Sequence, residues 1–493
     1  MIRAMDFSPP LRAVLEALID AKARPVIVGG SVRDSMREQP VKDYDIEVYG
    51  VDRMDTLSQM LRPFGSVNEV GQQFGVLKLR LQSEEVDIAL PRTETKVGAG
   101  HRGFSVTTDG DLDFAMAARR RDFTINAMGY DVANDAWLDP YGGREDLEAG
   151  VLRHVDADTF VEDPLRVYRA VQFAARFEMR LAEETLMLCR QMVAEGQLDE
   201  LPRERVWAEW QKLLLQAPRP SVGLELMRDL GIIQRYFPQL HAIIDVPQNP
   251  EYHPEGDVWR HTMMAVDAMA NELEKKLEIR NEKLEIADKD RLVYMLAILC
   301  HDLGKATHTT IEYDGKVERY DPAIHDPLPT THPLRIRAIG HEAAGVEPAR
   351  AMLEKLTGEK ALVEAILPLV EHHLKPATYY RNGAKAKTIR RLSTKVTIRD
   401  LILVAKADFL GRDRDDARSG IDPSGEWLTE RAQALGVYTS PPAPLLHGRD
   451  LIALGMEPSP RFGEILDALY EEQLRGTITT RDEAMVWVRR RIM

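Results

Sequence analysis

Residues 26–47 are VIVGGSVRDSMREQPVKDYDIE, and this stretch predicts both the start of the fold and its chemistry. A short apolar strand leads through two glycines into a helix, and a second strand follows that carries Asp43 and Asp45. Residues two apart on a strand point to the same face, so the two carboxylates are expected to project together. Such a pair suits two divalent metal ions in phosphoryl or nucleotidyl transfer. An isolated D-x-D is commonly a solvated turn, but the nearby GGSVRD favours transfer chemistry here.

The glycine turn of this stretch is suited to binding a triphosphate. Gly29 and Gly30 allow the backbone to approach a ligand closely, and Ser31 is a good N-cap residue for the helix that follows. The first N–H groups of that helix have no partners within it and can donate to phosphate oxygens. We therefore expect nucleotide contacts at Gly30 and Ser31.

Residues 1–140 are predicted to form a mixed α/β domain. Asp87 lies in the apolar strand VDIAL, where burying a carboxylate is costly unless it has a partner. It is therefore the best third carboxylate for a cluster with Asp43 and Asp45, and the alternative is an edge-strand aspartate that faces water. The predicted strands are 25–28, 45–49, 76–81 and 86–90, with a helix after Gly30.

The block EDPLR at 162–166 suggests how a base could be selected. Asp163 and Arg166 are three residues apart, so on a helix they would share the face opposite an apolar stripe. Cytosine and adenine both present an amino donor beside a ring-nitrogen acceptor, which match a carboxylate and a guanidinium, whereas guanine and uracil present the reverse order. A site built on such hydrogen bonds rejects the mismatch. The pair therefore predicts selection of C and A by protein alone, and the alternative is a surface salt bridge.

These motifs resemble those of the nucleotidyltransferases that build the 3′ end of tRNA and of the related bacterial poly(A) polymerases. The chain keeps the order and approximate spacing of the family's motifs over roughly its first 220 residues. Its further blocks are PRTETKVGAGHRGF (91–104), RRRDFTINAM (119–128), EDPLRVYRAVQFAARF (162–177) and PRERVWAEWQKLL (202–214).

The resemblance implies a polymerase-β-like α/β nucleotidyltransferase head with a mixed sheet, followed by a mostly α-helical neck and body. It implies Mg²⁺ as cofactor, CTP and ATP as substrates, and tRNA as partner. Asp43 and Asp45 would hold the metal ions, and Asp87 would assist as base or as ligand of the primer's terminal hydroxyl. The residues expected to bind nucleotide are Gly30, Ser31, Arg33, Arg120, Arg121, Asp122, Asn126, Asp163, Arg166 and Arg169.

Two of these blocks add chemical detail. The guanidinium groups of Arg120 and Arg121 offer forked contacts to phosphate oxygens, and Asn126 would share a helix face with Asp122, four residues earlier. The segment 91–104 combines three glycines with basic residues, as suits a loop that closes over the nucleotide or the primer end. In the family, a mobile loop at this place helps the switch from adding C to adding A.

A second catalytic signature lies further along the chain, because nine of the 13 histidines fall between residues 253 and 373. Imidazole and carboxylate ligands in this arrangement suit Mn²⁺, Fe²⁺, Ni²⁺ or Zn²⁺, which can generate hydroxide for attack on a phosphate ester. The order H…HD…H…H…D resembles the HD-domain metal phosphohydrolases and implies phosphatase and 2′,3′-cyclic phosphodiesterase activity. The predicted ligands are His261, His301, Asp302, His341, His373 and Asp408.

Other histidines of this region are left outside the predicted site. His308, His325 and His332 are expected to be ordinary loop residues, and either member of the pair His372–His373 could face the metal. The segment 306–338, between HDLGK and GHE, is longer than expected and rich in Pro, Thr and Asp. It is predicted to be either an ordered lid or a disordered insertion.

The domain organisation follows from length and composition. A chain of 493 residues predicts about two to four domains. The Pro-rich segment 245–257 is a predicted boundary, and residues 440–493 resemble a terminal element that would hold RNA or would serve only as a packing appendage. The predicted domains are the head (1–140), the helical neck and RNA-binding body (141–245), the HD domain (257–415) and a C-terminal helical module (440–493).

Charge and cysteine content limit the partners. With only two cysteines no disulfide framework is possible, so a cytoplasmic location is expected, and no apolar run is long enough to span a membrane. The net charge of −14 argues against loose nucleic-acid binding, so RNA would need a local basic surface. The candidates, each of which could equally be a solvated helix face, are Arg119–Arg121, Arg203 with Arg205, and Lys385–Arg399.

Taken together, these patterns predict an enzyme that adds C and A to tRNA 3′ ends. Within the same class, it could add only A, only CC, or poly(A) tails. From other classes, it could be a phosphohydrolase whose head only binds RNA, or a non-catalytic RNA-binding regulator. The intact carboxylates of the head argue against both of these. The pattern predicts no oligomeric state.

Overall fold

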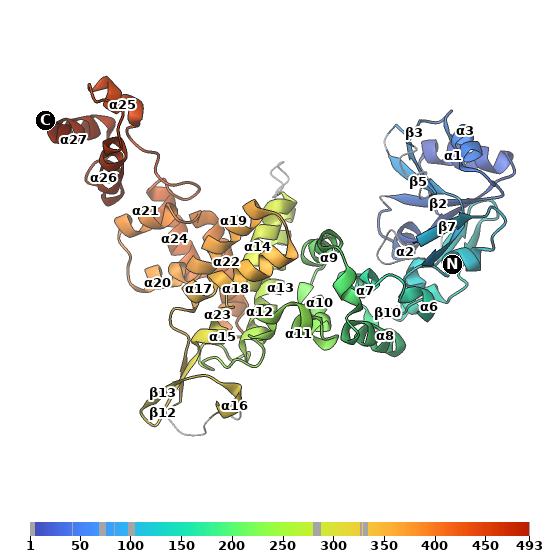
Figure 1. Ribbon diagram of the computed structural model, residues 1–493, viewed down its shortest axis with the longest axis horizontal. Coiled ribbons are helices and arrows are strands. Elements are labelled where there is room, and N and C mark those ends of the chain that lie inside the picture. The colour runs from blue at the N-terminus through green and yellow to red at the C-terminus, as the bar shows by residue number, and fades with distance from the viewer. Residues whose placement is uncertain are drawn as a thin grey trace. The chain divides into compact units, whose positions relative to one another are not determined.

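The computed structural model describes residues 5–41, 43–68, 75–82, 84–96, 104–279, 287–325, 328 and 334–492 (Figure 1). The chain divides into two compact units. The first contains residues 1–217 and 222–232, and the second contains residues 218–221 and 233–493. Finer division into head, neck, HD domain and C-terminal module stays a prediction.

The first unit is built around a seven-stranded sheet in the order β3-β4-β5-β2-β1-β8-β9. β2 and β5 are parallel and the other pairs are antiparallel, which confirms a mixed sheet. The four predicted strands occur within one residue of their expected bounds. The strands are β1 (Arg24–Val28), β2 (Tyr44–Tyr49), β3 (Ser66–Asn68), β4 (Val76–Arg80), β5 (Glu85–Ala89), β8 (Gly129–Asp131) and β9 (Ala136–Leu138).

Helices cover this sheet because apolar stripes on them match its apolar face. In α1 (Pro9–Asp20), Leu11, Val14, Leu15 and Leu18 are buried in the sheet's core cluster. Ser8 Oγ accepts from the amide of Leu11 and caps the start of this helix. Further elements are α2 (Gly30–Met36), α3 (Met54–Leu61), α4 (Phe114–Ala118), the 3₁₀ turn η2 (Thr124–Asn126), and the separate ribbon of β6 (Arg92–Lys96) and β7 (Phe104–Thr108). Residues 97–103 of the predicted closing loop lie outside the described residues.

The rest of the first unit is mostly helical, as predicted. α7 packs against α9, and a side chain at Gly223 would meet Leu213 of α9 at 2.5 Å. The elements are α5 (Gly143–Glu148), β10 (Val151–Leu152), α6 (Ala157–Phe160), α7 (Leu165–Phe177), β11 (Arg180–Leu181), α8 (Glu183–Ala194), η3 (Gln197–Glu200), α9 (Arg203–Gln216) and most of α10 (Pro220–Asp229). Nearly all of α11 (Ile232–Tyr236) belongs to the second unit.

The second unit is a helical bundle in which α13 and α14 pack with α19 and α22. The apolar run predicted at 292–300 is the buried end of α14. The helices are α12 (Pro238–His241), α13 (Val258–Ile279), α14 (Asp288–Cys300), α15 (Lys305–His308), α16 (Pro322–His325), α17 (His341–Ala344), α18 (Val346–Leu356), α19 (Lys360–His372), α20 (Lys375–Arg381), α21 (Ala386–Ser393), α22 (Ile398–Leu410), α23 (Asp415–Arg418) and α24 (Pro423–Ala434).

The segment 306–338 is ordered wherever the structure describes it. Its strands β12 (Thr310–Tyr313), β13 (Lys316–Arg319) and β14 (Arg335–Arg337) form an antiparallel sheet with β12 in the centre. The described part of the segment therefore has regular secondary structure, and its role as a lid stays a prediction. Residues 326–327 and 329–333, which include His332, lie outside the described residues.

The C-terminal residues form a helical module with its own apolar cluster. α25 (Gly448–Ala453), α26 (Arg461–Arg475) and α27 (Arg481–Ile492) enclose Leu451, Leu469 and Val488, which are fully or almost fully buried. Among the described residues of the whole chain, no helix has both the length and the apolar character needed to cross a membrane.

Candidate active sites

The three predicted carboxylates of the head lie at one end of the central strands. Asp45 of β2 is paired in register with Asp87 of β5, and Asp43 comes directly before β2. Neighbouring residues of paired strands present their side chains to the same face, so Asp45 and Asp87 lie side by side. β5 lies between β4 and β2, so Asp87 does not belong to an edge strand and that alternative is wrong. The fold therefore brings the predicted cluster together.

The surroundings of Asp45 favour a cation. Burial raises the pKa of Asp45, Arg121 opposes this, and Asp87 and Asp43 raise the pKa further. Carboxylates held this close disfavour each other's charge unless a cation is shared between them. Lys78 of β4 lies 3.3 Å from Asp87 and offers that carboxylate one positive partner.

Gly29 makes room for this cluster. Its φ of 72° lies in the left-handed region, and a Cβ there would lie 3.1 Å from Nη1 of Arg121 and 3.5 Å from Oδ2 of Asp45. The start of α2 differs from expectation, because Gly29, not Ser31, is its N-cap residue. Ser31 lies inside the helix, and its hydroxyl donates to the carbonyl of Val28 at 2.9 Å. Because Gly29 adopts a positive φ and takes the N-cap position, α2 begins at Gly30. This is earlier than the start expected with Ser31 as the N-cap residue.

Glu47 is a member of this site that the sequence analysis missed. It is 2% exposed and accepts hydrogen bonds from Arg120 at 3.0 Å, from Arg121 at 2.9 Å and from Tyr49 at 3.0 Å. Burial alone would raise the pKa of Glu47, but Arg121 and Arg120 outweigh it and the pKa is lowered. The sequence could have indicated Glu47, because it follows Asp45 by two residues and therefore lies on the same face of β2.

The other predicted nucleotide ligands form a hydrogen-bonded network. Asn126 donates to Asp122 at 3.0 Å, and Nε of Arg169 donates to the other oxygen of Asp122 at 2.7 Å. Arg33 is 6% exposed and donates to the side-chain carbonyl of Asn126 at 2.7 Å. Asp122 and Asn126 thus meet as predicted, but Asn126 lies in the 3₁₀ turn η2 and not on a helix shared with Asp122.

Asp163 and Arg166 are not bonded to each other, and their predicted joint reading of a base stays a prediction. Asp163 lies before α7 and accepts two hydrogen bonds from the guanidinium of Arg205, at 2.8 and 3.2 Å. Arg166 instead donates to the carbonyl of Thr159 at 2.6 Å and to the carbonyl of Arg120. Both residues are therefore held in place by separate partners, and the alternative of a salt bridge between them is wrong. Arg205, predicted only as a possible RNA contact, is the residue that holds Asp163.

The six predicted metal ligands of the second unit converge in its core. Oδ1 of Asp302 lies 3.1 Å from Nε2 of His341 and 3.8 Å from Nε2 of His373. Oδ2 of Asp302 lies 3.2 Å from Nε2 of His301 and 3.9 Å from Nε2 of His261. Nε2 of His261 also lies 3.1 Å from Asp408.

The hydrogen bonds of these rings fit metal coordination. Nδ1 of His301, His341 and His373 each contacts a backbone carbonyl three residues earlier, at 2.6, 2.6 and 2.7 Å. Their Nε2 atoms are buried and face the carboxylate of Asp302, which lies 3.2 Å from Nε2 of His301 and 3.1 Å from Nε2 of His341. Metal-binding histidines commonly have Nδ1 fixed in this way, which leaves Nε2 for the ion. The donor set therefore fits divalent transition-metal ions.

The ligands fall into two groups that share Asp302. His261, His301 and Asp408 form one group, and Asp302, His341 and His373 form the other. Because each oxygen of Asp302 faces a different group, the geometry offers places for two cations with Asp302 between them. Of the pair His372–His373, the structure places His373 at the cluster.

Several residues that support this cluster were missed or only partly predicted. Glu255 is 2% exposed, and Nδ1 of both His253 and His261 lies 2.8 Å from its Oε1. Lys305 contacts Asp302 at 2.6 Å, and Arg412 donates to Asp408 at 3.2 Å. Glu255 is acidic, but its sequence surroundings resemble a polar connection, so nothing local distinguished it from a solvated glutamate.

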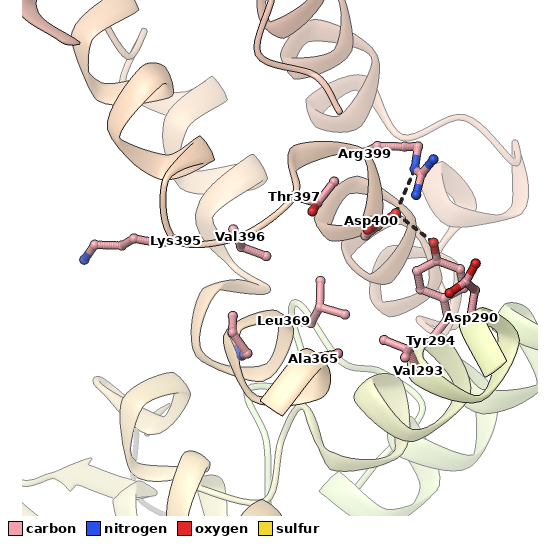
Figure 2. Close-up of a pocket in the computed structure, with 11 residues that line it drawn as sticks. Asp290, Val293, Tyr294, Ala365, Leu369, Lys395, Val396, Thr397, Arg399 and Asp400 are labelled. Atoms are coloured by element: carbon pink, nitrogen blue, oxygen red, sulfur yellow. Dashed lines mark hydrogen bonds and ion pairs between the residues drawn. The ribbon is translucent and has the colours of Figure 1, made fainter. Parts of the chain in front are cut away.

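Two cavities of the second unit differ in their relation to this cluster. The larger, of about 830 Å³, contains Asp302, His341 and Asp408 in its lining. The smaller, of about 270 Å³, lies at the start of α22, where Tyr294 and Arg399 both donate to Asp400 (Figure 2). No predicted catalytic, nucleotide or metal residue is among the described residues that line the smaller cavity. The larger cavity is therefore the candidate substrate site.

Comparison with known families and proteins identifies the domains of the chain and its fold. The poly A polymerase head domain matches residues 26–153, a probable RNA and SrmB-binding site of polymerase A matches residues 178–244, and the HD domain matches residues 258–413. The chain has a fold similar to a CCA-adding enzyme solved with CTP, with a TM-score of 0.60, 21% identity and coverage of 99% of this chain and 96% of that one. A Thermotoga maritima CCA-adding enzyme complexed with tRNA gives a TM-score of 0.57 at 20% identity, covering 99% and 97% of the two chains.

Proteins of higher sequence similarity define the family. The multifunctional CCA protein of Neisseria meningitidis serogroup A is 38% identical over 338 residues, which cover 69% of each chain. That of Laribacter hongkongensis is 36% identical over 394 residues, which cover 78% of this chain and 84% of the relative. That of Acidovorax sp. (strain JS42) is 39% identical over 401 residues, covering 78% and 82%. This chain belongs to the family of multifunctional CCA proteins.

Proposed function

We propose that this protein completes the 3′ end of tRNA by adding C, C and A from CTP and ATP. The observation that carries the proposal is the position of Asp45 beside Asp87 in neighbouring strands, with Asp43 directly before the first of them. Gly29 leaves room next to Asp45 and Arg121 for a ligand. Membership of the multifunctional CCA protein family supports CCA addition over A addition or poly(A) synthesis. Solved CCA-adding enzymes of the same fold, one with CTP and one with ATP, support the choice of nucleotides.

In this proposal the head residues bind and orient the substrates. Asp43 and Asp45 would hold Mg²⁺, which would stabilise charge on the transferring phosphoryl group and activate the primer hydroxyl. Asp87 would orient the terminal 3′-hydroxyl of the tRNA. Arg120 and Arg121, held by Glu47, would bind the triphosphate and keep its charge in place. No residue forms a covalent intermediate.

Base selection is assigned to residues at the start of α7. Arg166 would donate to the ring nitrogen of C or A, and Asp163 would accept from the amino group. A carboxylate has about four lone-pair positions, so Asp163 can receive the base while Arg205 still contacts it. The hydrogen bonds of Arg166 to two carbonyls support a fixed donor, which is what a protein template requires.

A second activity is proposed for the other unit, because a specific observation favours it. The buried Nε2 atoms that converge on Asp302 support a phosphohydrolase centre that uses Mn²⁺, Ni²⁺ or Fe²⁺. Bound cations would supply a hydroxide nucleophile at neutral pH. Phosphate monoesters and 2′,3′-cyclic phosphates are the proposed substrates.

The test of the main function is extension of three tRNA transcripts, which end at the discriminator base, after the first C, and after CC. With Mg²⁺, CTP and ATP, we expect CCA on the first transcript and no further addition. Addition of A only to the CC-ending transcript would identify an A-adding enzyme. Unlimited A on any RNA would identify a poly(A) polymerase. No extension of any transcript would overturn the proposal for the head.

A further inference from the structure

One wall of the 830 Å³ cavity comes from the β12–β14 sheet and not from the helical bundle. The cavity is lined on one side by Asp302, His341 and Asp408 and on another by the continuous run 334–342. That run contains β14 and leads directly into α17, which carries His341. Figure 1 shows β12 and β13 extending from the second unit next to α15. The segment between HDLGK and GHE is thus part of the hydrolytic site.

The sheet is fixed to the bundle beside the metal cluster. Ile311 and Ile336 are opposite each other in register, at 0% and 6% exposure, and anchor β12 and β14. The hydroxyl of Thr309 donates to the carbonyl of Lys305, the residue that contacts Asp302. The hydroxyl of Tyr320 donates to the carbonyl of Asp245 at 3.1 Å. These contacts hold β14 at a defined place in the cavity wall.

Two arginines project from β14 on the face opposite Ile336. The side chains of Arg335 and Arg337 are 56% and 52% exposed, and both line the cavity. Within the described residues, the ion pairs of both are with Glu312, at 3.9 Å each. At that distance and exposure an ion pair is weak, so both guanidinium groups can bind another anion.

The positive side chains nearest the metal cluster, unlike the two arginines of β14, are closely paired with carboxylates. Lys305 lies 2.6 Å from Asp302, and Arg412 donates to Asp408 at 3.2 and 3.3 Å, so both cations are committed to carboxylates. Glu251 and Glu342 also line the cavity, so the lining as a whole carries no large positive excess. Away from the metals, the cations that line the cavity are Arg335 and Arg337 of β14 and Arg381 of α20, and the first two lie together on one strand.

We propose that Arg335 and Arg337 bind phosphate groups adjacent to the one that is hydrolysed, and that this pair makes the site prefer the 3′ terminus of an RNA chain to a free mononucleotide. Arg337 is four residues from His341, and four extended residues span at most about 14 Å. The pair therefore lies within reach of the nucleotides that precede the terminus. Forked guanidinium contacts to phosphate are strong and geometrically selective.

The inference rests on the proposed phosphohydrolase function of the same site. For a 2′,3′-cyclic phosphate, a water oxygen forms a bond to phosphorus, one P–O bond of the ring breaks, and the released ribose oxygen takes the proton. No oxidant or reductant is needed. The arginine pair does not contact the reacting atoms in this scheme, so it acts through substrate binding.

The test compares two substrates in the full-length, metal-loaded protein. One is an oligoribonucleotide that ends in a 2′,3′-cyclic phosphate, and the other is the mononucleotide 2′,3′-cyclic AMP. For Arg335→Gln/Arg337→Gln, we expect kcat/KM on the oligonucleotide to fall at least about tenfold through KM, with less than about twofold change on the mononucleotide. The slope of log kcat/KM against log salt on the oligonucleotide should become shallower by roughly 1.4, which is the value for two lost phosphate contacts.

The matched control is Lys316→Gln/Arg319→Gln, which removes two positive charges from β13 outside the cavity lining. This variant should keep the wild-type preference for the oligonucleotide. If the β14 variant loses activity equally on both substrates, or on neither, the inference is overturned while the phosphohydrolase function stands. If the wild-type protein hydrolyses neither substrate, the proposed function itself fails, and the inference with it.

Discussion

At the scale of single residues, Glu47 is the best test of how the triphosphate arginines are held. Glu47→Gln removes the charge that pairs with Arg120 and Arg121 while keeping the shape of the side chain. Hydrogen bonds to charged groups contribute about 1.5–3 kcal/mol, so we expect kcat/KM for CTP and ATP to fall roughly ten- to 100-fold. Steady-state extension of a tRNA transcript measures this. Glu85→Gln, which changes an exposed partner of Lys78, should have little effect, and an equal loss in both variants would refute the role of Glu47.

Arg205 provides a second test at the same scale, because it holds Asp163 and not the triphosphate. In Arg205→Ala, the carboxylate of Asp163 loses its two-pronged partner and can rotate away from the base. We expect kcat/KM for CTP to fall about tenfold and the incorporation of U relative to C to rise. Arg203→Ala, two residues earlier on α9, is the control. A uniform loss for all four nucleotides, with unchanged selectivity, would show that Arg205 has only a structural role.

At the scale of elements, the sequence predicted most of the head. Short apolar segments located β1, β2, β4 and β5 within one residue, and Asp87 in VDIAL was predicted to lie near Asp43 and Asp45, which the pairing of β5 with β2 achieves. What the sequence analysis missed involves partners distant in the chain. Asp163 is bound by Arg205, which lies 42 residues away, and the local helical spacing around Asp163 carries no sign of this contact. Long-range pairs leave no periodic signal, whereas the metal ligands were found because histidine and aspartate are rare together in apolar helices.

The packing of α15 against α17 depends on Gly304. A Cβ at this position would lie 2.0 Å from the carbonyl oxygen of His341, a contact that backbone atoms cannot avoid by rotation of a side chain. We expect Gly304→Ala to destabilise the second unit by about 3 kcal/mol or more and to lower metal content. Gly463→Ala is the control, since no atom lies within 4 Å of its Cβ and alanine stabilises a helix by about 0.5–1 kcal/mol. Thermal unfolding and metal analysis of both variants measure the difference.

The two ligand groups around Asp302 predict how many cations the second unit binds. His341→Ala removes a ligand from the group that also contains His373, and leaves His261, His301 and Asp408 intact. We expect metal analysis to show two ions per chain in the wild type and one in this variant. His372→Ala, which changes the neighbouring histidine outside the cluster, should retain two. A single ion in the wild-type protein would contradict the sharing of Asp302.

At the scale of the whole molecule, the two proposed catalytic centres lie in two different compact units, and each has its own carboxylates. The centres share no residue, because Asp43 and Asp45 belong to the first unit and Asp302 to the second. A substitution in one centre therefore has no direct chemical route to the other. In a bifunctional enzyme, a substitution in one centre should therefore abolish one activity and leave the other. In a phosphohydrolase whose head only binds RNA, there would be no nucleotide addition to abolish.

Reciprocal substitutions test that independence. Asp43→Ala removes an exposed carboxylate at the start of β2, so we expect nucleotide addition to fall below detection with folding and hydrolysis of 2′,3′-cyclic AMP unchanged. Asp302→Asn removes the charge shared by both ligand groups, so hydrolysis should be lost while CCA addition stays within about twofold of wild type. Each variant serves as the folding control for the other. Nucleotide addition that survives Asp43→Ala would disprove the assignment of the head, and loss of both activities in either variant would show that the two centres depend on each other.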